Sequence, residues 1–521
     1  SNSFWTILLD GTGAAPGQIS ILDSQGSPDD QQINFTLTND DALNFVLGEI
    51  SVQTFSIINN GGSTLWIKDL DVSSSFFKLD PQTDPDTDTG YYMIPAGQSL
   101  AVAVTFAPRS IFNGSSLVTI TSTANLQDSA ADQTDTITLL GKSYYSAQVG
   151  ELNGQKLTKI LINDSNGETI QIKLTGGGYA NVRLVGGGFS GDIEKIELVG
   201  TTDKSVLTII SPKTSSYEDM GVTIPIKNYT TTVGSITGSN AKNIILKNAT
   251  LSSEEGGIDL AKLTGKLKLG NIEDGADITI GQITGKGAKI TAGAIGDDTE
   301  ITIGGDVASF TAQTFGNSSF HANNVNKLTI TGKNSSAPVQ GSFSVDGLLK
   351  NFNAGKLDFT GAIDAASIAK VSLGSMANAV VNTQSTLQAL TVQRDAVDSL
   401  ICGGYSIDLG SDGKLGGTGL AADVFTQLAS GSLVSIKIGD NYDGSTIATG
   451  MAPTITPSGY ADFFAPLAGF TSGSVGTVSL GSITPNNQGV TFGVTATTSI
   501  GKVTIGGQAA QNQANFRVLL V

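Results

Sequence analysis

A short segment, in which two apolar residues flank one polar residue and glycine follows, recurs along the chain beyond Gly150. Examples are Ile278–Gly281, Ile301–Gly304, Val371–Gly374, Ile436–Gly439, Val478–Gly481 and Val503–Gly506. In a strand, this pattern puts both apolar side chains on one face, and the glycine lets the chain turn. Such segments are too short to be stable alone, but stacked coils share an apolar interior. The repeat therefore predicts a β-solenoid, a parallel β-helix with two or three strands per coil, over residues 148–521.

The composition also favours β-structure. Charged residues make up 14% of the chain, against about 25% in an ordinary domain. Ser, Thr, Val and Ile favour pleated surfaces, the 65 glycines suit tight corners, and helix formers such as Glu, Lys and Arg are scarce. We therefore predict an all-β protein. Because 521 residues exceed one compact core, it has two or more domains unless a repeat extends a single one.

The charge balance excludes some partners. With 29 basic and 46 acidic residues the net charge is −17, which repels nucleic-acid phosphates, so we expect no nucleic-acid partner. No apolar run reaches the length of about 18 residues that a membrane-spanning helix needs, and no membrane span is expected. Ser1 is interpreted as a processed N-terminus, and the hydroxyl-rich composition with several Asn-x-Ser/Thr triplets predicts an extracellular, cell-surface location. The single cysteine, Cys402, is expected to pack in a core.

Residues 1–147 carry a different pattern. Strand-like segments recur about every ten residues and are separated by Gly, Asn, Asp and Pro turns, which predicts an immunoglobulin-like β-sandwich. The expected strands include Phe4–Leu9, Ile33–Leu37, Val52–Ile58, Leu65–Ile67, Phe76–Leu79, Leu100–Phe106, Leu117–Thr121 and Asp135–Leu140. Asn59–Gly62 is the clearest turn.

Residues 40–142 resemble a known family. Phe55–Leu65, Phe76–Leu79, Ile94–Leu100, Val102–Pro108 and the closing Leu139–Gly141 occur in the order typical of the abnormal-spindle/Hydin-type immunoglobulin-like domain. Bacterial surface proteins carry this domain as "choice-of-anchor D" modules. The resemblance implies a non-catalytic spacer or binding module with no active-site residues, followed here by a bacterial surface-type parallel β-helix.

The best metal candidate lies in the acidic insertion 80–90. Asp84, Asp86 and Asp88 alternate as the hard oxygen ligands of a calcium loop do. Gly90 comes one place later than the EF-hand rule requires, and no Glu closes the site. Calcium is thus the single candidate cofactor, and a solvated acidic loop is the alternative.

Catalytic residues are not predicted, and neither is an enzyme. The only histidine, His321, leaves no material for a Ser-His-Asp triad. An enzyme would need paired carboxylates, for which the candidates are Asp297 with Asp298 and Glu300, Glu254 with Glu255, and Asp440 with Asp443. Both tryptophans lie in the first module, which leaves no tryptophan platform for a polysaccharide in the second region.

Three stretches interrupt the repeat. Residues 383–398 fit a short helix or strands, whereas 417–430 and Tyr460–Leu467 have helical patterns. We therefore expect helical insertions, or a helical cap over one end of the solenoid, near residues 417–467.

These features predict a structural subunit of an extracellular microbial surface assembly, such as a surface layer (S-layer), sheath or fibre, whose partner is itself. The apolar segments Phe4–Leu9 and Phe516–Val521 either close their own domains or add to a neighbour's sheet edge. One alternative is an adhesin that binds cell-surface glycans through loops, and a second is a polysaccharide-active β-helix enzyme.

Overall fold

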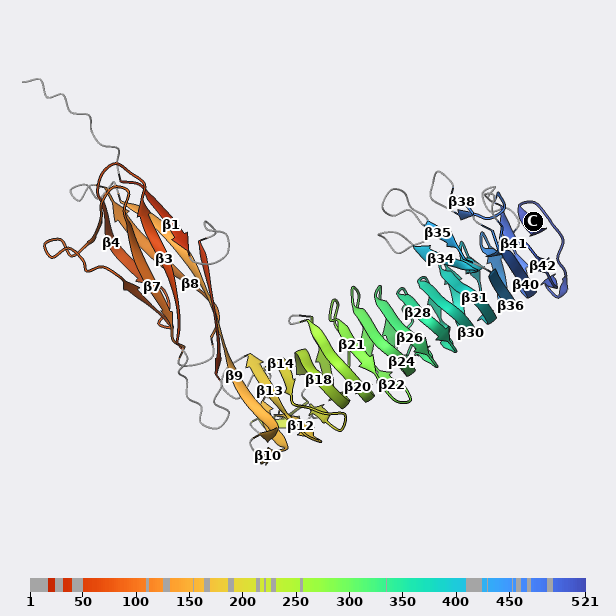
Figure 1. Cartoon of the computed structure of the whole chain (residues 1–521), viewed down its shortest axis with the longest axis horizontal. Coiled ribbons are helices and arrows are strands. Elements are labelled where there is room, and N and C mark those ends of the chain that lie inside the picture. The colour runs from red at the N-terminus through yellow and green to blue at the C-terminus, as the bar shows by residue number, and fades with distance from the viewer. Residues whose placement is uncertain are drawn as a thin grey trace, which may run out of the picture. The chain divides into compact units, whose positions relative to one another are not determined.

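The computed structural model contains strands and connecting loops, with no helix among the residues that it describes, so the all-β prediction is confirmed. The described residues are 17–23, 31–39, 50–108, 112–124, 132–152, 154–163, 169–185, 192–211, 216–219, 222–225, 231–253, 256–333, 335–408, 424–428, 430–451, 453–455, 461–465, 470–484 and 491–521. No helix in this part of the chain is long and apolar enough to cross a membrane. The chain divides into two compact units (Figure 1): unit 1 is Ser1–Ala147 with Arg183–Asp192, and unit 2 is Gln148–Val182 with Ile193–Val521.

Unit 1 is an immunoglobulin-like sandwich of two sheets. The first sheet has the order β1-β3-β7-β5, all antiparallel, with bounds β1 (Ile19–Asp23), β3 (Ser51–Asn59), β7 (Ser99–Phe106) and β5 (Phe77–Pro81). The second has the order β2-β9-β8-β4-β6, with bounds β2 (Gln32–Asn39), β9 (Gln133–Leu152), β8 (Asn113–Thr123), β4 (Leu65–Val72) and β6 (Tyr92–Ile94). β2 pairs with β9 in parallel, and the other neighbours are antiparallel.

The core of unit 1 lies between these sheets. Burial alternates along β7, where Leu100, Val102, Val104 and Phe106 face inward. The Phe106 ring packs on Phe77 with centroids 4.8 Å apart and on Phe35 at 5.7 Å. The alternation predicted from the sequence therefore places one aromatic-rich layer between two sheets. The expected strand Phe4–Leu9 lies outside the described residues.

Asn59 ends β3 at the predicted turn and is fully buried. Its side-chain amide donates to the carbonyl oxygens of Ser63 at 2.8 Å and Ile94 at 2.9 Å, and its Oδ1 accepts from the Gly61 N–H at 2.9 Å. One side chain thus satisfies backbone groups of the turn and of β6, which explains why an Asn stands here.

Unit 2 begins with mixed pairing. β10 (Gln155–Leu157) forms a hairpin with β9, and β11 (Lys159–Asn163), β12 (Thr169–Thr175) and β15 (Val206–Ile210) are antiparallel neighbours. β13 (Tyr179–Val185) follows β12, and β16 (Ser216–Asp219) with β17 (Val222–Pro225) forms a separate hairpin. From β14 (Asp192–Val199) and β15 onward, pairing with β18 (Thr231–Lys247) is parallel.

Two long parallel ladders then run through unit 2. Ladder A joins buried residues in the order Ile236, Ile258, Ile278, Ile301, Phe320, Phe343, Ile363, Val381, Ile401, Ile447 and Val494, then half-buried Val518. Ladder B joins Leu207, Ile244, Leu267, Ile290, Phe310, Leu328, Phe352, Val371, Leu390, Ile436, Val478 and Val503, all buried. Most successive partners lie roughly 20 residues apart in the sequence. Each repeat of the chain therefore lies against the repeat before it (Figure 1).

The ladders share several long strands. β20 (Gly257–Lys268) pairs with β21 (Ile278–Ile283) through its first part and with β22 (Ala288–Thr291) through its last, and both then pair with β24 (Glu300–Ala312). Such rings of pairing close the strand network on itself. The other ladder strands are β26 (Ser319–Val325), β27 (Leu328–Ile330), β28 (Ser342–Leu349), β29 (Phe352–Phe359), β30 (Ala362–Ala377), β31 (Val380–Val392), β33 (Leu400–Gly403), β36 (Ser430–Asp443), β37 (Thr446–Thr449), β40 (Ser472–Ile483), β41 (Phe492–Ala496), β42 (Ser499–Ile500), β43 (Val503–Ile505), β44 (Gln508–Ala509) and β45 (Phe516–Leu520).

A third, shorter set of pairings, ladder C, follows ladder B in each repeat. It includes Leu251, Ile272, Ile295 and Phe315, and later Phe359, Met376, Ala396, Tyr442 and Ile483. Its strands are short: β19 (Ala249–Leu251), β23 (Ala294–Ile295), β25 (Thr314–Phe315) and β32 (Ala396–Val397). Most repeats thus contribute one segment to each of three ladders.

Several of the repeated glycines have a different role from the one expected, whereas Gly506 stands at a turn with a φ of +56°, as the repeat predicts. Gly304 lies inside β24 rather than at a turn, and a Cβ there would lie 2.0 Å from the carbonyl oxygen of Gly281 in the previous repeat. A Cβ at Gly481 would lie 2.1 Å from the carbonyl oxygen of Gly439. Close approach of the neighbouring repeat therefore requires glycine at these places.

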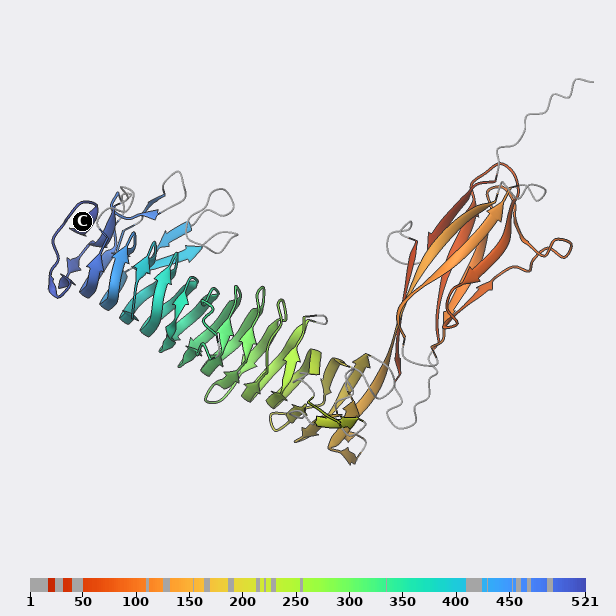
Figure 2. The same ribbon diagram turned by 180° about the vertical axis from the view of Figure 1, so that it is seen from behind.

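The predicted helices near residues 417–467 are wrong for the described part of that region. β34 (Tyr405–Asp408) pairs antiparallel with β35 (Val424–Gln427), and β38 (Thr454–Ile455) pairs with β39 (Ala461–Asp462). Residues 383–392 belong to β31, so the strand alternative holds there. These two hairpins, the side arms, leave the ladders next to β33 and β37 on one side of unit 2 (Figure 2). Their apolar residues pack against the outer surface of ladder A, a tertiary contact that local sequence pattern does not reveal.

Candidate functional site

The predicted calcium loop is held by its own hydrogen bonds. Asp86 Oδ1 accepts from the Thr89 N–H and Thr89 Oγ1, both at 2.9 Å, and from the Asp88 N–H at 3.2 Å. These bonds, with the Thr89 N–H first, lower the pKa of Asp86. No group of three or more His, Cys, Asp or Glu side chains in the described ranges is arranged to hold a metal, and Asp84, Asp86 and Asp88 are among the residues searched. Calcium at this loop stays a prediction.

Acidic and amide side chains at the turns of unit 2 bind the next repeat. Asp274 Oδ1 accepts from the Asp297 N–H at 2.9 Å, and Asp297 Oδ1 accepts from the Asn317 N–H at 2.7 Å. Asp277 Oδ1 does the same for the Glu300 N–H at 2.7 Å. Because these donors lie in a following repeat, the side chains hold the turns of neighbouring repeats together.

The carboxylates that the sequence offers as catalytic candidates therefore have different partners in the structure. Asp297 bonds backbone, while Glu300 Oε1 accepts from Thr302 Oγ1 at 3.0 Å. Asp443 has a raised pKa because of burial first and the Asp398 charge second. Glu254 and Glu255 lie outside the described residues. His321 Nε2 lies 3.0 Å from Asp346 Oδ1 on the exposed surface.

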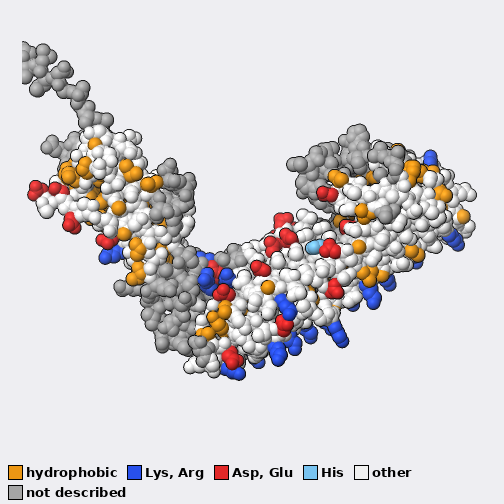
Figure 3. All heavy atoms as spheres, viewed as in Figure 1, with side chains coloured by type: hydrophobic (Ala, Val, Ile, Leu, Met, Phe, Trp, Pro, Cys, Tyr) orange, Lys and Arg blue, Asp and Glu red, His pale blue; other side chains and the backbone are white. Residues whose placement is uncertain are grey.

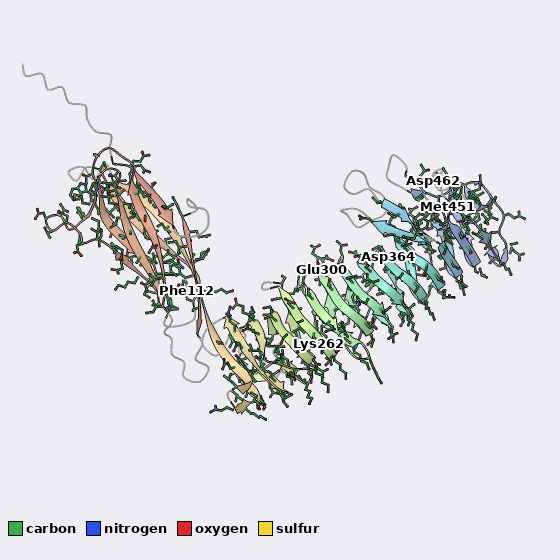
Figure 4. All side chains as sticks on the ribbon, viewed as in Figure 1. Phe112, Lys262, Glu300, Asp364, Met451 and Asp462 are labelled. Carbon is green, nitrogen blue, oxygen red and sulfur yellow. The ribbon has the colours of Figure 1, made fainter. Side chains whose placement is uncertain are left out.

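The side arms create a second apolar core on the outer surface of ladder A. It contains Leu400, Cys402, Tyr405, Ala448, Met451 and Phe463, all buried, with Ile407 and Phe425 packed against it. The Tyr405 hydroxyl donates to the Met451 carbonyl oxygen and accepts from the Met451 N–H at 2.9 Å, which fixes one arm to the segment that follows β37. Positions that face outward elsewhere along ladder A are covered here. Figure 4 shows Met451 and Asp462 on this side of unit 2, as well as Glu300 and Asp364.

Buried polar groups line the base of this core. Asp364, Asn382 and Cys402 are register partners in three successive repeats. Asn382 Nδ2 donates to Asp364 Oδ1 at 2.6 Å and to the Tyr405 carbonyl oxygen at 2.8 Å, and Cys402 Sγ donates to Asn382 Oδ1 at 3.2 Å. Burial is the largest cause of the raised pKa of Asp364 and of the strongly raised pKa of Cys402. Cys402 is thus a packed, protonated thiol, as the sequence predicted, and has no thiolate with which to react.

Basic side chains gather on the outer surface of ladder B. Lysines in its segments or within two residues of them include the following, all exposed: Lys247, Lys266, Lys268, Lys289, Lys327, Lys350, Lys370, Lys437 and Lys502. Figure 3 shows Lys and Arg side chains in a row along one side of unit 2, and many of the acidic side chains in that view lie on the other side.

This separation of charge was not predicted from the sequence, although part of it is visible there. Lys stands directly before the first apolar residue at Leu267, Ile290, Leu328, Val371 and Val503, which are all ladder B positions. At ladder A, Asp277 and Glu300 precede Ile278 and Ile301, and Ser precedes Phe320 and Phe343. A lysine directly before the apolar pair therefore marks these five ladder B positions, whereas Ile436 and Val478 of the same ladder follow Ser435 and Thr477.

Comparisons with known proteins add little. No family model matches the chain, and no curated protein matches it. Among solved structures, it is similar to the ASH / PapD-like domain of human CEP192 (PapD-like domain 7), with 15% identity and a TM-score of 0.16, over 27% of this chain and 96% of that chain. Because that TM-score is low, the immunoglobulin-like fold of unit 1 is assigned from its own strand order and core.

Proposed function

We propose that this protein is a structural subunit of an extracellular microbial surface assembly, such as a surface layer, sheath or fibre, that associates with copies of itself. Under this proposal unit 2 is a parallel β-helix that acts as a stiff body, and unit 1 is a spacer module of the abnormal-spindle/Hydin type. The protein would act outside the cell and would have no catalytic activity.

The observation that carries the proposal is the continuity of ladders A and B through unit 2. The internal strands of these two ladders are paired on both sides, and the register positions are buried from Ile236 to Val494 in ladder A and from Leu207 to Val503 in ladder B. Stacked repeats of this kind give stability along one axis and present the same surface many times. Repeated surfaces suit binding to another repetitive object, including a second copy.

An adhesin is the second candidate, and the side arms favour it. They interrupt the regular ladders and carry aromatic residues, of which Phe425 is half-buried and packs against Phe463 with ring centroids 5.8 Å apart. Loops placed on a rigid body are common recognition sites. In this candidate the arms bind cell-surface glycans and the ladders serve as a stalk.

Electron microscopy of the purified full chain tests the first candidate. We expect ordered lattices or filaments, and dispersed single particles at every concentration would contradict the proposal. A glycan array probed with the protein at concentrations where it is dispersed tests the second, since glycan binding that is lost when the arms are removed supports an adhesin. Turnover of acidic and neutral polysaccharides, with and without calcium, would contradict the assignment as a non-enzyme.

A further inference from the structure

The outer surface of ladder B, here called the lysine face, is basic in a chain whose net charge is −17. It is made of the exposed lysines beside the ladder B positions, from Lys247 to Lys502. No Asp or Glu occurs in the described ladder B segments 243–247, 266–268, 288–291, 309–312, 327–330, 351–354, 370–373, 389–392, 435–438, 477–480 and 502–505. Within these segments the positive charge of the lysine face is therefore not interspersed with negative charge.

The lysines of this face repel one another. Lys266 and Lys289 are direct register partners in neighbouring strands, and such strands lie about 4.8 Å apart. Like charges directly opposite each other destabilise a sheet. Ion pairs of lysines in the described part of the chain include Lys68–Asp132, Lys156–Glu151 and Lys262–Asp203, and none of these three involves the lysine face. The face therefore lacks a counter-charge of its own.

The outer surface of ladder A, here called the acidic face, carries the opposite charge. Asp259, Asp277, Glu300, Asp306 and Asp346 are exposed in its strands or directly beside them. They occur in the same stack of repeats as the lysines, so both faces share one axial spacing. Lys262, which also lies in β20, already pairs with Asp203 at 2.8 Å.

We propose that the lysine face of one copy docks against the acidic face of a second copy. This inference rests on the proposed self-association and names the surfaces that make it. Charge complementarity selects the occupant, and the common spacing lets several lysines meet carboxylates at once, in registers that differ by one repeat. Because the two faces are different surfaces, the contact is heterologous and each copy retains a free face for the next one.

A charge-swap experiment tests the pairing. The first variant is K289E/K327E/K370E and the second is D259K/E300K/D346K. Each alone opposes like charges, so we expect its association constant, measured by sedimentation velocity, to fall at least about tenfold. An equimolar mixture of the two variants opposes unlike charges again, and we expect association to return. Far-UV circular dichroism of each variant checks that the fold is kept.

The matched control is K78E/K156E/K204E, which changes the net charge equally at exposed lysines outside the lysine face. We expect it to associate like the original protein. If the original protein associates and the two variants do so equally well, the lysine face is not the interface and this inference fails alone. If the original protein stays monomeric, the proposed function fails with it. Binding of polyglutamate that K289E/K327E/K370E abolishes, with unchanged self-association, would assign the face to a polyanion and overturn the inference.

Discussion

The two units reach stability through different kinds of contact. In unit 1, strands far apart in the sequence pair around one closed core, so that β3 and β7 lie side by side although 51–59 and 99–106 are separated by three other strands. In unit 2, most repeats pair with the repeats directly before and after them. In a closed core each position has its own neighbours and occurs once. In stacked repeats the same packing arrangement recurs from one repeat to the next. This difference explains why unit 2 displays rows of like side chains, such as the exposed lysines beside ladder B.

The largest expected effect is the loss of folding free energy when a buried ring is removed, and it should spread differently in the two units. Phe106→Ala in unit 1 and Phe343→Ala in unit 2 each remove a fully buried ring, and each should cost about 3 to 5 kcal/mol. In unit 1 the loss should weaken the entire sandwich, because one core serves both sheets. In unit 2 it should act mainly on β26, β28 and β30, the strands around Phe343.

Hydrogen exchange measured by mass spectrometry distinguishes these outcomes. For Phe343→Ala we expect faster exchange in and beside β28 and unchanged protection in β40 and β41, which lie several repeats away. Uniformly faster exchange throughout unit 2 would show that its repeats unfold as a single unit and would contradict the comparison.

A smaller loss of stability is expected where the backbones of neighbouring repeats are in close contact. Gly304→Ala places a Cβ 2.0 Å from the Gly281 carbonyl oxygen, so the strands must move apart at a cost of about 1 to 3 kcal/mol. Gly114→Ala in unit 1 is the matched control, because the nearest atom to its Cβ is a Phe112 ring carbon at 3.6 Å, an ordinary contact. Urea unfolding followed by circular dichroism should show a lower midpoint for the first substitution alone.

The side arms provide a local test. Tyr405→Phe leaves the buried Met451 N–H without its 2.9 Å partner, which should cost about 1 to 2 kcal/mol. Because Cys402 lies in the same core, its alkylation rate reports opening of the arms. We expect faster alkylation of Cys402 in the variant under native conditions. An unchanged rate would mean that the arms do not cover the thiol.

The smallest effect concerns pH. The folded pKa of Asp364 is raised by burial, so its protonated form is favoured in the fold, and the stability that this supplies is present below the unfolded pKa and lost as pH rises through the folded pKa. Asp364→Asn keeps an oxygen that accepts from Asn382 and removes the buried charge. We expect the variant to be more stable than the original at neutral pH and equal to it in acid. A gain in the variant's free energy of unfolding, relative to the original protein, that increases as pH falls would contradict this prediction.

The sequence predicted the parts of the fold that depend on local pattern. Alternation in Leu100–Phe106 identified a sandwich strand, and Ile278–Gly281 and its equivalents identified repeated strands. It did not predict the arms, because Val424–Gln427 becomes a strand only through pairing with Tyr405–Asp408 and packing on ladder A. The role of Gly304 was also missed, since close approach of the Gly281 carbonyl depends on register between repeats.

The lysine face and the acidic face could be predicted only in part from the sequence. Each lysine was visible beside its apolar segment, as Lys289 is beside Ile290, but the assignment of that segment to ladder B needed the register. The loop of Asp84, Asp86 and Asp88 shows the reverse, because its alternating carboxylates predicted a calcium ligand set, whereas Asp86 accepts hydrogen bonds from Thr89. A calcium titration followed by thermal unfolding of unit 1 tests the remaining prediction.

Sedimentation velocity of the full chain across a salt series tests the central claim most directly. If complementary faces join the copies, association should be strong near about 50 mM NaCl and should weaken steeply toward about 500 mM, because salt screens attraction between opposite charges. If the net charge of −17 dominates instead, copies repel at low salt and association should increase with salt. Increasing association, or a single monomer boundary at every salt concentration, would contradict the account.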